Sequence, residues 1–226
     1  MKRRLHRIIE KIKTFIKRYV VVDELFIARE QFKLDNAERG LRYVYPLNQD
    51  SVVVDLGGYV GEWAERISTM YDCTIYIFEP VKEFADQAIQ RFKDNKKVHI
   101  YTFGVSDKDE ETTISLNGVA SSVFVAGKGT SIKLRDIKTV FEELHIKNVD
   151  LLKMNIEGGE YAVLPRMIEN DMISKCKDLQ IEFHHFYPDA EKLRENIRSS
   201  LKKTHHLTYD YPFFFESWRK DDEIIV

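Results

Sequence analysis

The sequence predicts an α/β fold built around a mostly parallel sheet that helices cover on both faces. Strand-like and helix-like segments alternate along most of the 226 residues, which is the pattern of repeated strand–helix–strand units. The strand-like runs, such as residues 51–55 and 149–152, are largely apolar without a polar alternation, as expected for strands buried on both faces. Because no repeat or low-complexity linker interrupts the pattern, we expect a helical segment over residues 1–45 and one main domain over residues 46–226.

In the first half of the chain, residues 23–45 have a helical pattern. The β-branched run at residues 51–58 ends in glycines, which indicates a buried strand and a tight turn. Helix signals follow at residues 62–70, and the run "CTIYIFEP" at residues 73–80 predicts a second strand. Residues 82–95 then have the apolar period of an amphipathic helix.

The second half begins with a strand-like run at residues 97–107. Residues 111–133 alternate polar and apolar side chains between Gly and Ser breaks, which indicates one or two small antiparallel strands, and residues 134–146 are helical. Strands and helices then alternate at residues 149–157, 160–171, 178–186 and 189–203, before a strand-like aromatic tail at residues 205–226.

The composition indicates a globular chain, with 43% hydrophobic and 32% charged residues. No apolar run approaches the roughly 20 residues that span a bilayer, and the N-terminus lacks the features of a signal peptide. The two cysteines, Cys73 and Cys176, have no metal-ligand or CxxC spacing. We therefore expect a cytoplasmic protein with reduced thiols.

The charge is distributed unevenly along the chain. Residues 1–20 hold eight Lys or Arg against one Glu, which leaves 27 basic and 36 acidic residues in the remainder. An acidic body disfavours nucleic acid as a partner, because affinity for phosphates comes from a basic surface. The same 20 residues have apolar side chains at helical spacing, so the expected helix either lies on an anionic membrane or a partner, or packs on its own domain or a second subunit of a homo-oligomer.

Polar side chains stand at the ends of four predicted strands. Ligands of open α/β sheets bind outside the carboxyl ends of the strands, so these positions are candidate site residues. They are Asp55 with the following glycines, Glu79 with Pro80, Asn155 with Glu157, and Glu182 with His184 and His185.

The first two strand ends indicate a nucleoside-containing cofactor. Glycines after Asp55 let a ligand approach the backbone, and Glu79, 24 residues further on, can accept both hydroxyls of a ribose. The dinucleotide fingerprint G-x-G-x-x-G fails because Leu56 occupies the position of its first glycine. A carboxylate at Asp55 would repel a pyrophosphate but suits a cationic ligand, and S-adenosylmethionine is such a ligand.

The sequence resembles the FkbM-type S-adenosylmethionine-dependent methyltransferases over residues 51–185. The resemblance is carried by "VVDLGGYVGEWA", "IYIFEPVKEFADQAIQRF", "VSD", "VDLLKMNIEGGEYAVL" and "IEFH", in that order. It implies a Rossmann-like class I methyltransferase fold, with a mostly parallel seven-stranded sheet, helices on both faces and added N-terminal helices. It also implies methylation of a hydroxyl on a sugar, a glycan or another small metabolite.

The resemblance further implies which residues hold the cofactor. The residues next to its methionine part, ribose and adenine would be Asp55, Gly57, Gly58, Tyr59, Gly61, Glu79, Pro80, Ser106 and Asp107. The family's Lys-x-Asp-x-Glu-Gly motif falls on residues 153–158, with Asn155 in place of the Asp, and Tyr59 stands where Asn is common. A degenerate protein that binds the cofactor or a partner without turnover therefore stays an alternative, as does, less strongly, an NAD-dependent oxidoreductase.

Methyl transfer to a hydroxyl needs a base, and the candidate catalytic residues are His184, Glu157 and Asn155. We favour His184 as the base because an imidazole titrates near neutral pH. Strand alternation places Glu182 on the face of His184, where it could orient the ring. His184 could instead be a hydrogen-bonded structural residue, and Glu160 is expected in the first turn of a helix. We expect no metal.

Overall fold

The structure of the chain is a computed structural model that describes residues 24–117, 120–122 and 129–221. The predicted basic amphipathic helix of residues 1–20 lies outside the described residues, so its contact with a membrane, a partner or a second subunit stays a prediction. No helix in the described part of the chain is long and apolar enough to cross a membrane.

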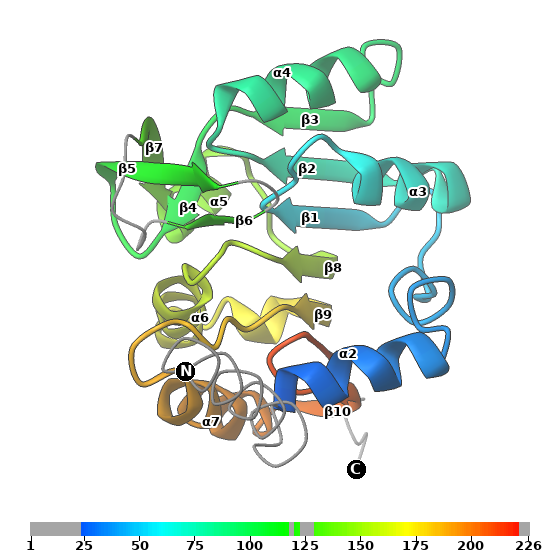
Figure 1. The fold of residues 1–226 in the computed structure, drawn as a ribbon. Helices are drawn as coiled ribbons and strands as arrows, with labels where there is room; N and C mark the ends of the chain where they lie inside the picture. Colours follow the sequence, from blue (N-terminus) through cyan, green and yellow to red (C-terminus); the bar gives the residue numbers. More distant parts are fainter. Residues whose placement is uncertain (1–23, 118–119, 123–128, 222–226) are drawn as a thin grey trace, which may run out of the picture.

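A seven-stranded sheet forms the centre of the fold, in the order β10-β11-β9-β8-β1-β2-β3 (Figure 1). Its strands are β1 (Val52–Leu56), β2 (Thr74–Phe78), β3 (Val98–Tyr101), β8 (Val149–Met154), β9 (Cys176–Ile181), β10 (His205–Tyr211) and β11 (Phe215–Lys220). The five strands from β9 to β3 pair in parallel, and β11 pairs antiparallel with both of its neighbours. The predicted seven-stranded, mostly parallel sheet is confirmed.

Helices cover both faces of this sheet. Side chains of α5 (Ile137–Glu143), α6 (Glu160–Glu169) and α7 (Ala190–Leu201) pack on the face that contains Val54 and Leu152. Side chains of α3 (Glu62–Tyr71) pack on the opposite face, which contains Val53 and Leu151. Successive residues of β1 and β8 therefore enter opposite cores, which explains the unbroken apolar runs of both strands. A short 3₁₀ helix, η1 (Ile173–Lys175), precedes β9, and α4 (Lys82–Arg91) lies next to β3.

The N-terminal segment belongs to the same packing. Helix α2 (Glu24–Leu34) buries Phe32 against the β10–β11 hairpin, and turns rather than a longer helix follow it. Gln180 of β9 donates hydrogen bonds to the Arg42 carbonyl at 3.0 Å and to the Tyr45 hydroxyl at 2.8 Å. Residues 24–45 thus cover a polar part of the sheet that is itself buried.

A second sheet stands beyond the carboxyl ends of the parallel strands (Figure 1), in the order β4-β7-β5-β6. Its strands are β4 (Gly104–Ser106), β5 (Glu110–Asn117), β6 (Ala120–Ser122) and β7 (Thr130–Asp136). The single strand expected at residues 97–107 is therefore two strands, β3 and β4, and they belong to different sheets. Helix α5 begins only at Ile137, because the Asp136 carboxylate caps it by accepting from the Thr139 N–H at 2.8 Å.

A buried charge network attaches α7 to β11. The carboxylate of Glu216, 2% exposed, accepts from Arg194 Nε at 2.9 Å, from Arg198 Nη1 at 2.9 Å and from Trp218 Nε1 at 3.1 Å. Burial raises the pKa of Glu216, and the two guanidinium groups oppose this rise. Loss of one partner would leave charge in the interior without full compensation.

We expect Arg194→Met to lower the free energy of unfolding by about 3 kcal/mol, because Glu216 loses a buried counter-charge. Urea unfolding of the full chain measures the change. The control is Lys177→Met, which removes the exposed ion pair with Asp150 and should cost less than about 1 kcal/mol. Equal costs for the two variants would contradict a structural role for the buried network.

Candidate active site

The turn after β1 packs so closely against β8 and β2 that only glycines fit there. A Cβ at Gly57, whose φ is +79°, would lie 1.9 Å from the carbonyl oxygen of Asn155. A Cβ at Gly58 would lie 2.2 Å from Cγ2 of Ile77. The turn therefore passes directly beside the ends of β8 and β2, and its outer side is free to line a cavity.

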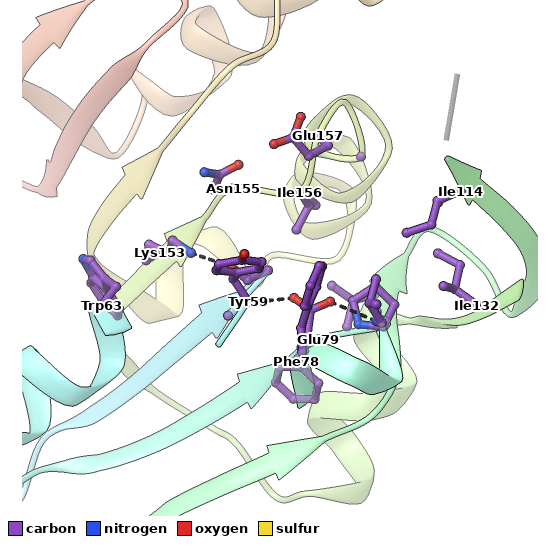
Figure 2. Close-up of a pocket in the computed structure, with 18 of the residues that line it drawn as sticks. Tyr59, Trp63, Phe78, Glu79, Ile114, Ile132, Lys153, Asn155, Ile156 and Glu157 are labelled. Carbon is purple, nitrogen blue, oxygen red and sulfur yellow. Dashed lines mark hydrogen bonds between the residues drawn. The ribbon is translucent and has the colours of Figure 1, made fainter. Parts of the chain in front are cut away.

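That cavity has a volume of about 360 Å³ and opens at the carboxyl ends of β1, β2 and β8 (Figure 2). Of the residues predicted to hold a cofactor or to act in catalysis, eight line it: Gly57, Gly58, Tyr59, Glu79, Pro80, Ser106, Asn155 and Glu157. Its size lies within the usual range for small-molecule sites. The predicted strand-end residues are thus largely brought together in one place.

Four predicted site residues are not part of the cavity wall. Gly61 lies against α4, where an added Cβ would be 2.8 Å from the Phe92 ring. Asp107 is exposed and accepts a hydrogen bond from Ser106 at 3.2 Å. Asp55 and His184 are buried beside the cavity and contact residues that line it. Any role of Asp55 or His184 in binding or catalysis would therefore act through its neighbours.

Asp55 pairs with Lys153. The Lys153 ammonium lies 2.8 Å from Oδ1 of Asp55 and also donates to the Gly57 carbonyl at 2.7 Å. Both side chains are almost fully buried, at 0% and 5% exposed. We expected the Asp55 carboxylate to meet a cationic ligand, but its counter-charge is Lys153. The lysine, which lines the cavity, connects the glycine turn to the end of β8.

Glu79 is held rigidly at the end of β2. Its carboxylate accepts from the backbone N–H of Tyr59 at 2.8 Å and from that of Val81 at 2.9 Å (Figure 2). Burial raises the pKa of this carboxyl, while the two N–H groups oppose the rise. Each oxygen still has a lone pair for a ligand hydroxyl.

The sequence did not identify the rest of the wall. An apolar side is formed by residues of the small sheet, Ile114 of β5 with Ile132 and Leu134 of β7. At another part of the wall, Trp63 of α3 lies near Lys153 (Figure 2), and Arg42 comes from the N-terminal segment. The alternation in residues 111–133 did signal one apolar face, but nothing in the sequence indicated that this face covers the site.

Asn155 and Glu182 form a pair at the ends of β8 and β9. Asn155 Nδ2 donates to Oε2 of Glu182 at 2.7 Å, and Asn155 Oδ1 is buried without a partner among the described residues. Burial raises the pKa of the Glu182 carboxyl to about 7, with Glu157 adding to the rise and His184 opposing it. Asn155 stands where the resemblance implies an Asp, so a neutral amide lies between the cavity wall and the Glu182 carboxyl.

His184 is held by Glu160, and the expected role of Glu182 in orienting its ring is wrong. Strand β9 ends at Ile181, so strand alternation does not extend to His184. Glu160, in the first turn of α6 as predicted and 0% exposed, contacts the backbone N–H of His184 at 2.8 Å and its Nδ1 at 3.0 Å. Burial opposes the imidazolium form, but the neighbouring carboxylates outweigh it and the pKa of His184 is raised.

Glu157 lies between the cavity and the pair formed by His184 and Glu160. Its Oε2 lies 3.5 Å from Nε2 of His184, and its own backbone has a φ of +52°, which is unusual for a residue with a side chain. Burial raises the pKa of its carboxyl, and the His184 imidazole opposes the rise. The order from the cavity inward is therefore Glu157, His184 and Glu160. Among the described residues, no group of three or more His, Cys, Asp or Glu side chains could hold a metal ion.

The strand order and the cavity at the carboxyl ends define a Rossmann-like class I methyltransferase fold. A family model, the methyltransferase FkbM domain, matches residues 55–211, more than half of the chain. The chain belongs to the FkbM methyltransferase family, as its resemblance implied. A search of curated proteins finds no match.

Several solved structures share the fold at low sequence identity. The methyltransferase FkbM from Methylobacillus flagellatus KT aligns with a TM-score of 0.54 and 15% identity, over 79% of this chain and 45% of that chain. An rRNA methylase from Streptococcus thermophilus aligns with a TM-score of 0.51 and 12% identity, over 78% and 90%. A putative rRNA-methylase from Clostridium thermocellum aligns with a TM-score of 0.52 and 9% identity, over 84% and 96%. At these identities the similarity concerns the fold alone.

The raised pKa of Glu182 predicts a pH-dependent stability. The ordinary pKa of 4.5 means that the unfolded chain loses this proton near pH 4.5, whereas the folded chain keeps it to about pH 7. The folded state therefore binds more protons in this window, and the free energy of unfolding falls as the pH rises through it.

We expect Glu182→Gln, which retains an acceptor for Asn155, to raise the free energy of unfolding by about 1–3 kcal/mol at roughly pH 8. Near pH 4.5 the difference from the wild type should be small, because Glu182 is then protonated in the folded state and in about half of the unfolded chains. Urea unfolding at the two pH values measures this difference. Asp50→Asn, in an exposed loop, is the control and should change neither value; a gain for Glu182→Gln that is the same at both pH values would contradict the assignment.

Proposed function

We propose that the protein is an S-adenosylmethionine-dependent methyltransferase that methylates a hydroxyl of a sugar, a glycan or another small metabolite. The observation that carries the proposal is the position of Glu79, whose fixed carboxylate faces the same cavity as the glycine turn of residues 57–58. A carboxylate of this kind accepts the two hydroxyls of a ribose, and the glycines allow a nucleoside to lie against the backbone.

The charges in the cavity wall fit a cationic ligand better than an anionic one. The wall contains four carboxylates and two cationic side chains: Glu38, Glu62, Glu79 and Glu157, with Arg42 and Lys153. A sulfonium with an α-ammonium group is attracted by this field, whereas the pyrophosphate of NAD would be repelled. The apolar side at Ile114 and Ile132 is suited to an adenine ring. These features favour S-adenosylmethionine over a dinucleotide.

When bound, such a cofactor supplies an activated methyl group on a sulfonium, and in-line transfer to a hydroxyl leaves a neutral thioether. The role of the protein is then to hold the hydroxyl and to take its proton. Glu157 lines the cavity and can touch an acceptor, whereas His184 stands behind it. We therefore infer that the Glu157 carboxylate accepts the proton of the acceptor hydroxyl. His184 is a positioning residue whose charge compensates that of Glu157.

The charge of the chain and the aromatic residues of the wall support the proposed acceptor class. Outside residues 1–20 acidic residues outnumber basic ones by 36 to 27, which disfavours a nucleic-acid acceptor. Trp63 and Tyr59 in the wall offer aromatic faces to a sugar ring. A protein that binds the cofactor without turnover is the alternative, and a screen of saccharides and metabolites for methyl transfer separates the two.

We expect Glu79→Gln to weaken binding of S-adenosylhomocysteine about 10–100-fold, because hydrogen bonds to a charged group are lost. Calorimetry with the full chain measures the affinity, and Asp50→Asn should leave it unchanged. Binding of NAD⁺ in place of S-adenosylhomocysteine would overturn the proposed function.

We expect Glu157→Gln to lower kcat about 10²–10⁴-fold with little change in S-adenosylhomocysteine affinity, because the variant lacks a base. His184→Gln should lower kcat less and shift its pH profile. Methyl transfer from labelled S-adenosylmethionine, with the best acceptor from a saccharide panel, gives both values. Full turnover by Glu157→Gln together with an inactive His184→Gln would return the role of base to His184.

A further inference from the structure

Helix α2 is apolar on two sides. Its inner side, with Ala28 and Phe32, is buried against the β10–β11 hairpin. Its outer side exposes Phe26, Ile27 and Leu34, whose exposed fractions are 50%, 52% and 79%. Leu34 follows Ile27 by seven residues, which is two helical turns, so the three side chains lie on one side of the helix. Exposed apolar side chains that gather in this way indicate a surface for a partner.

Basic side chains border this outer side. Arg29 and Lys33 follow Phe26 by three and seven residues, and both are exposed. Between them in the sequence, Glu30 pairs with the Lys33 ammonium at 2.7 Å, so its carboxylate is compensated. The outer side of α2 therefore combines apolar side chains with more positive than negative charge. It lies at the end of the molecule that holds β10 and α7 (Figure 1).

The chain immediately before α2 has the same two properties. Residues 1–20, here called the basic segment, hold eight Lys or Arg against one Glu, and their apolar side chains recur at helical spacing. Only three residues separate the basic segment from Glu24, the first residue of α2. Apolar side chains combined with Lys and Arg are typical of helices that lie in the interface of an anionic membrane.

Charge distinguishes the possible occupants of this surface. A two-fold dimer uses the same surface on both subunits, so it would bring two basic segments together. Packing of the basic segment on the outer side of α2 would place its cations beside Arg29 and Lys33. An anionic membrane instead attracts all of these cations while the apolar side chains leave water.

We propose that the outer side of α2 and the basic segment before it bind together to an anionic membrane surface, with Phe26, Ile27 and Leu34 inserted among the lipid headgroups. The cations of the basic segment then lie against the phosphates of the lipids. Neither the cofactor nor the acceptor takes part in this contact, so it is tested without methyl transfer and stands apart from the proposed function.

Co-sedimentation of the full chain with lipid vesicles tests the contact. The vesicles are phosphatidylcholine alone and an equal mixture of phosphatidylcholine with anionic phosphatidylglycerol. Wild type should bind the anionic vesicles at least about 100-fold more tightly, because each Lys or Arg near a negative surface adds to the attraction. Binding should weaken as the salt concentration rises, since salt screens exposed charges.

The variant Phe26→Ser/Leu34→Ser tests whether α2 itself touches the membrane. It should bind the anionic vesicles about 10–100-fold more weakly, because two apolar side chains no longer leave water on binding. Ile89→Ser is the matched control and should bind as wild type does. Ile89 is 45% exposed on α4, next to β3 at the opposite edge of the sheet. Circular dichroism reports whether both variants are folded.

A fluorescent probe, Phe26→Trp, reports insertion directly. The natural Trp63 and Trp218 are 6% and 0% exposed, so they contribute a background that vesicles leave unchanged. On anionic vesicles the new indole should shift its emission to shorter wavelengths, and lipids with brominated acyl chains should quench it.

The remaining outcomes would overturn the proposal. Wild-type vesicle binding by Phe26→Ser/Leu34→Ser, or an unshifted emission of Phe26→Trp, would exclude α2 from the contact. Without binding to anionic vesicles the membrane contact fails as a whole, and light scattering then identifies the occupant. A dimer that Phe26→Ser/Leu34→Ser dissociates would assign the surface to a second copy of the chain. A monomer whose free energy of unfolding falls on removal of residues 1–20 would assign it to the basic segment.

Discussion

The buried ion pair between Lys153 and Asp55 is the interaction on which the architecture of the site depends. It joins two strands whose sequences are far apart, and its ammonium also holds the Gly57 carbonyl, so that it fixes strand β1, strand β8 and the glycine turn together. A buried pair of this kind contributes little net stability against an apolar replacement, but it allows few alternative arrangements of its neighbours. Its role here is geometric, because it fixes the end of β8, and the cavity residues there, relative to β1.

A second group of ionisable side chains lies near this pair and is mainly acidic. Glu157, Glu160 and Glu182 gather around the single imidazole of His184. Burial raises the pKa of Glu182 to about 7 and also raises the pKa of Glu157, while the His184 imidazole opposes both rises. The proton balance of the site is therefore a property of the cluster rather than of one residue.

Much of the fold could be predicted from the sequence, because parallel strands buried on both faces leave unbroken apolar runs such as those of β1 and β8. The strand ends also indicated Glu79, Asn155 and Glu157, since polar residues there have no place in the core. The partner of Asp55 could not be predicted, because the pair joins residues 98 positions apart. The contacts of Glu160 with His184 were not predicted for a related reason. The alternation rule was applied beyond Ile181, where the strand has already ended.

The buried hydrogen bonds between Gln180 and the N-terminal segment have a practical consequence for work with shortened proteins. Gln180 lies on β9, between β11 and β8, and donates hydrogen bonds to Arg42, Tyr45 and Tyr209. Arg42 itself lines the cavity. A fragment that started where the family match starts, at residue 55, would uncover these groups and remove one side of the cavity. Expression plasmids for ligand soaking or screening should therefore retain everything from residue 24 onward, even though the recognisable motifs begin much later.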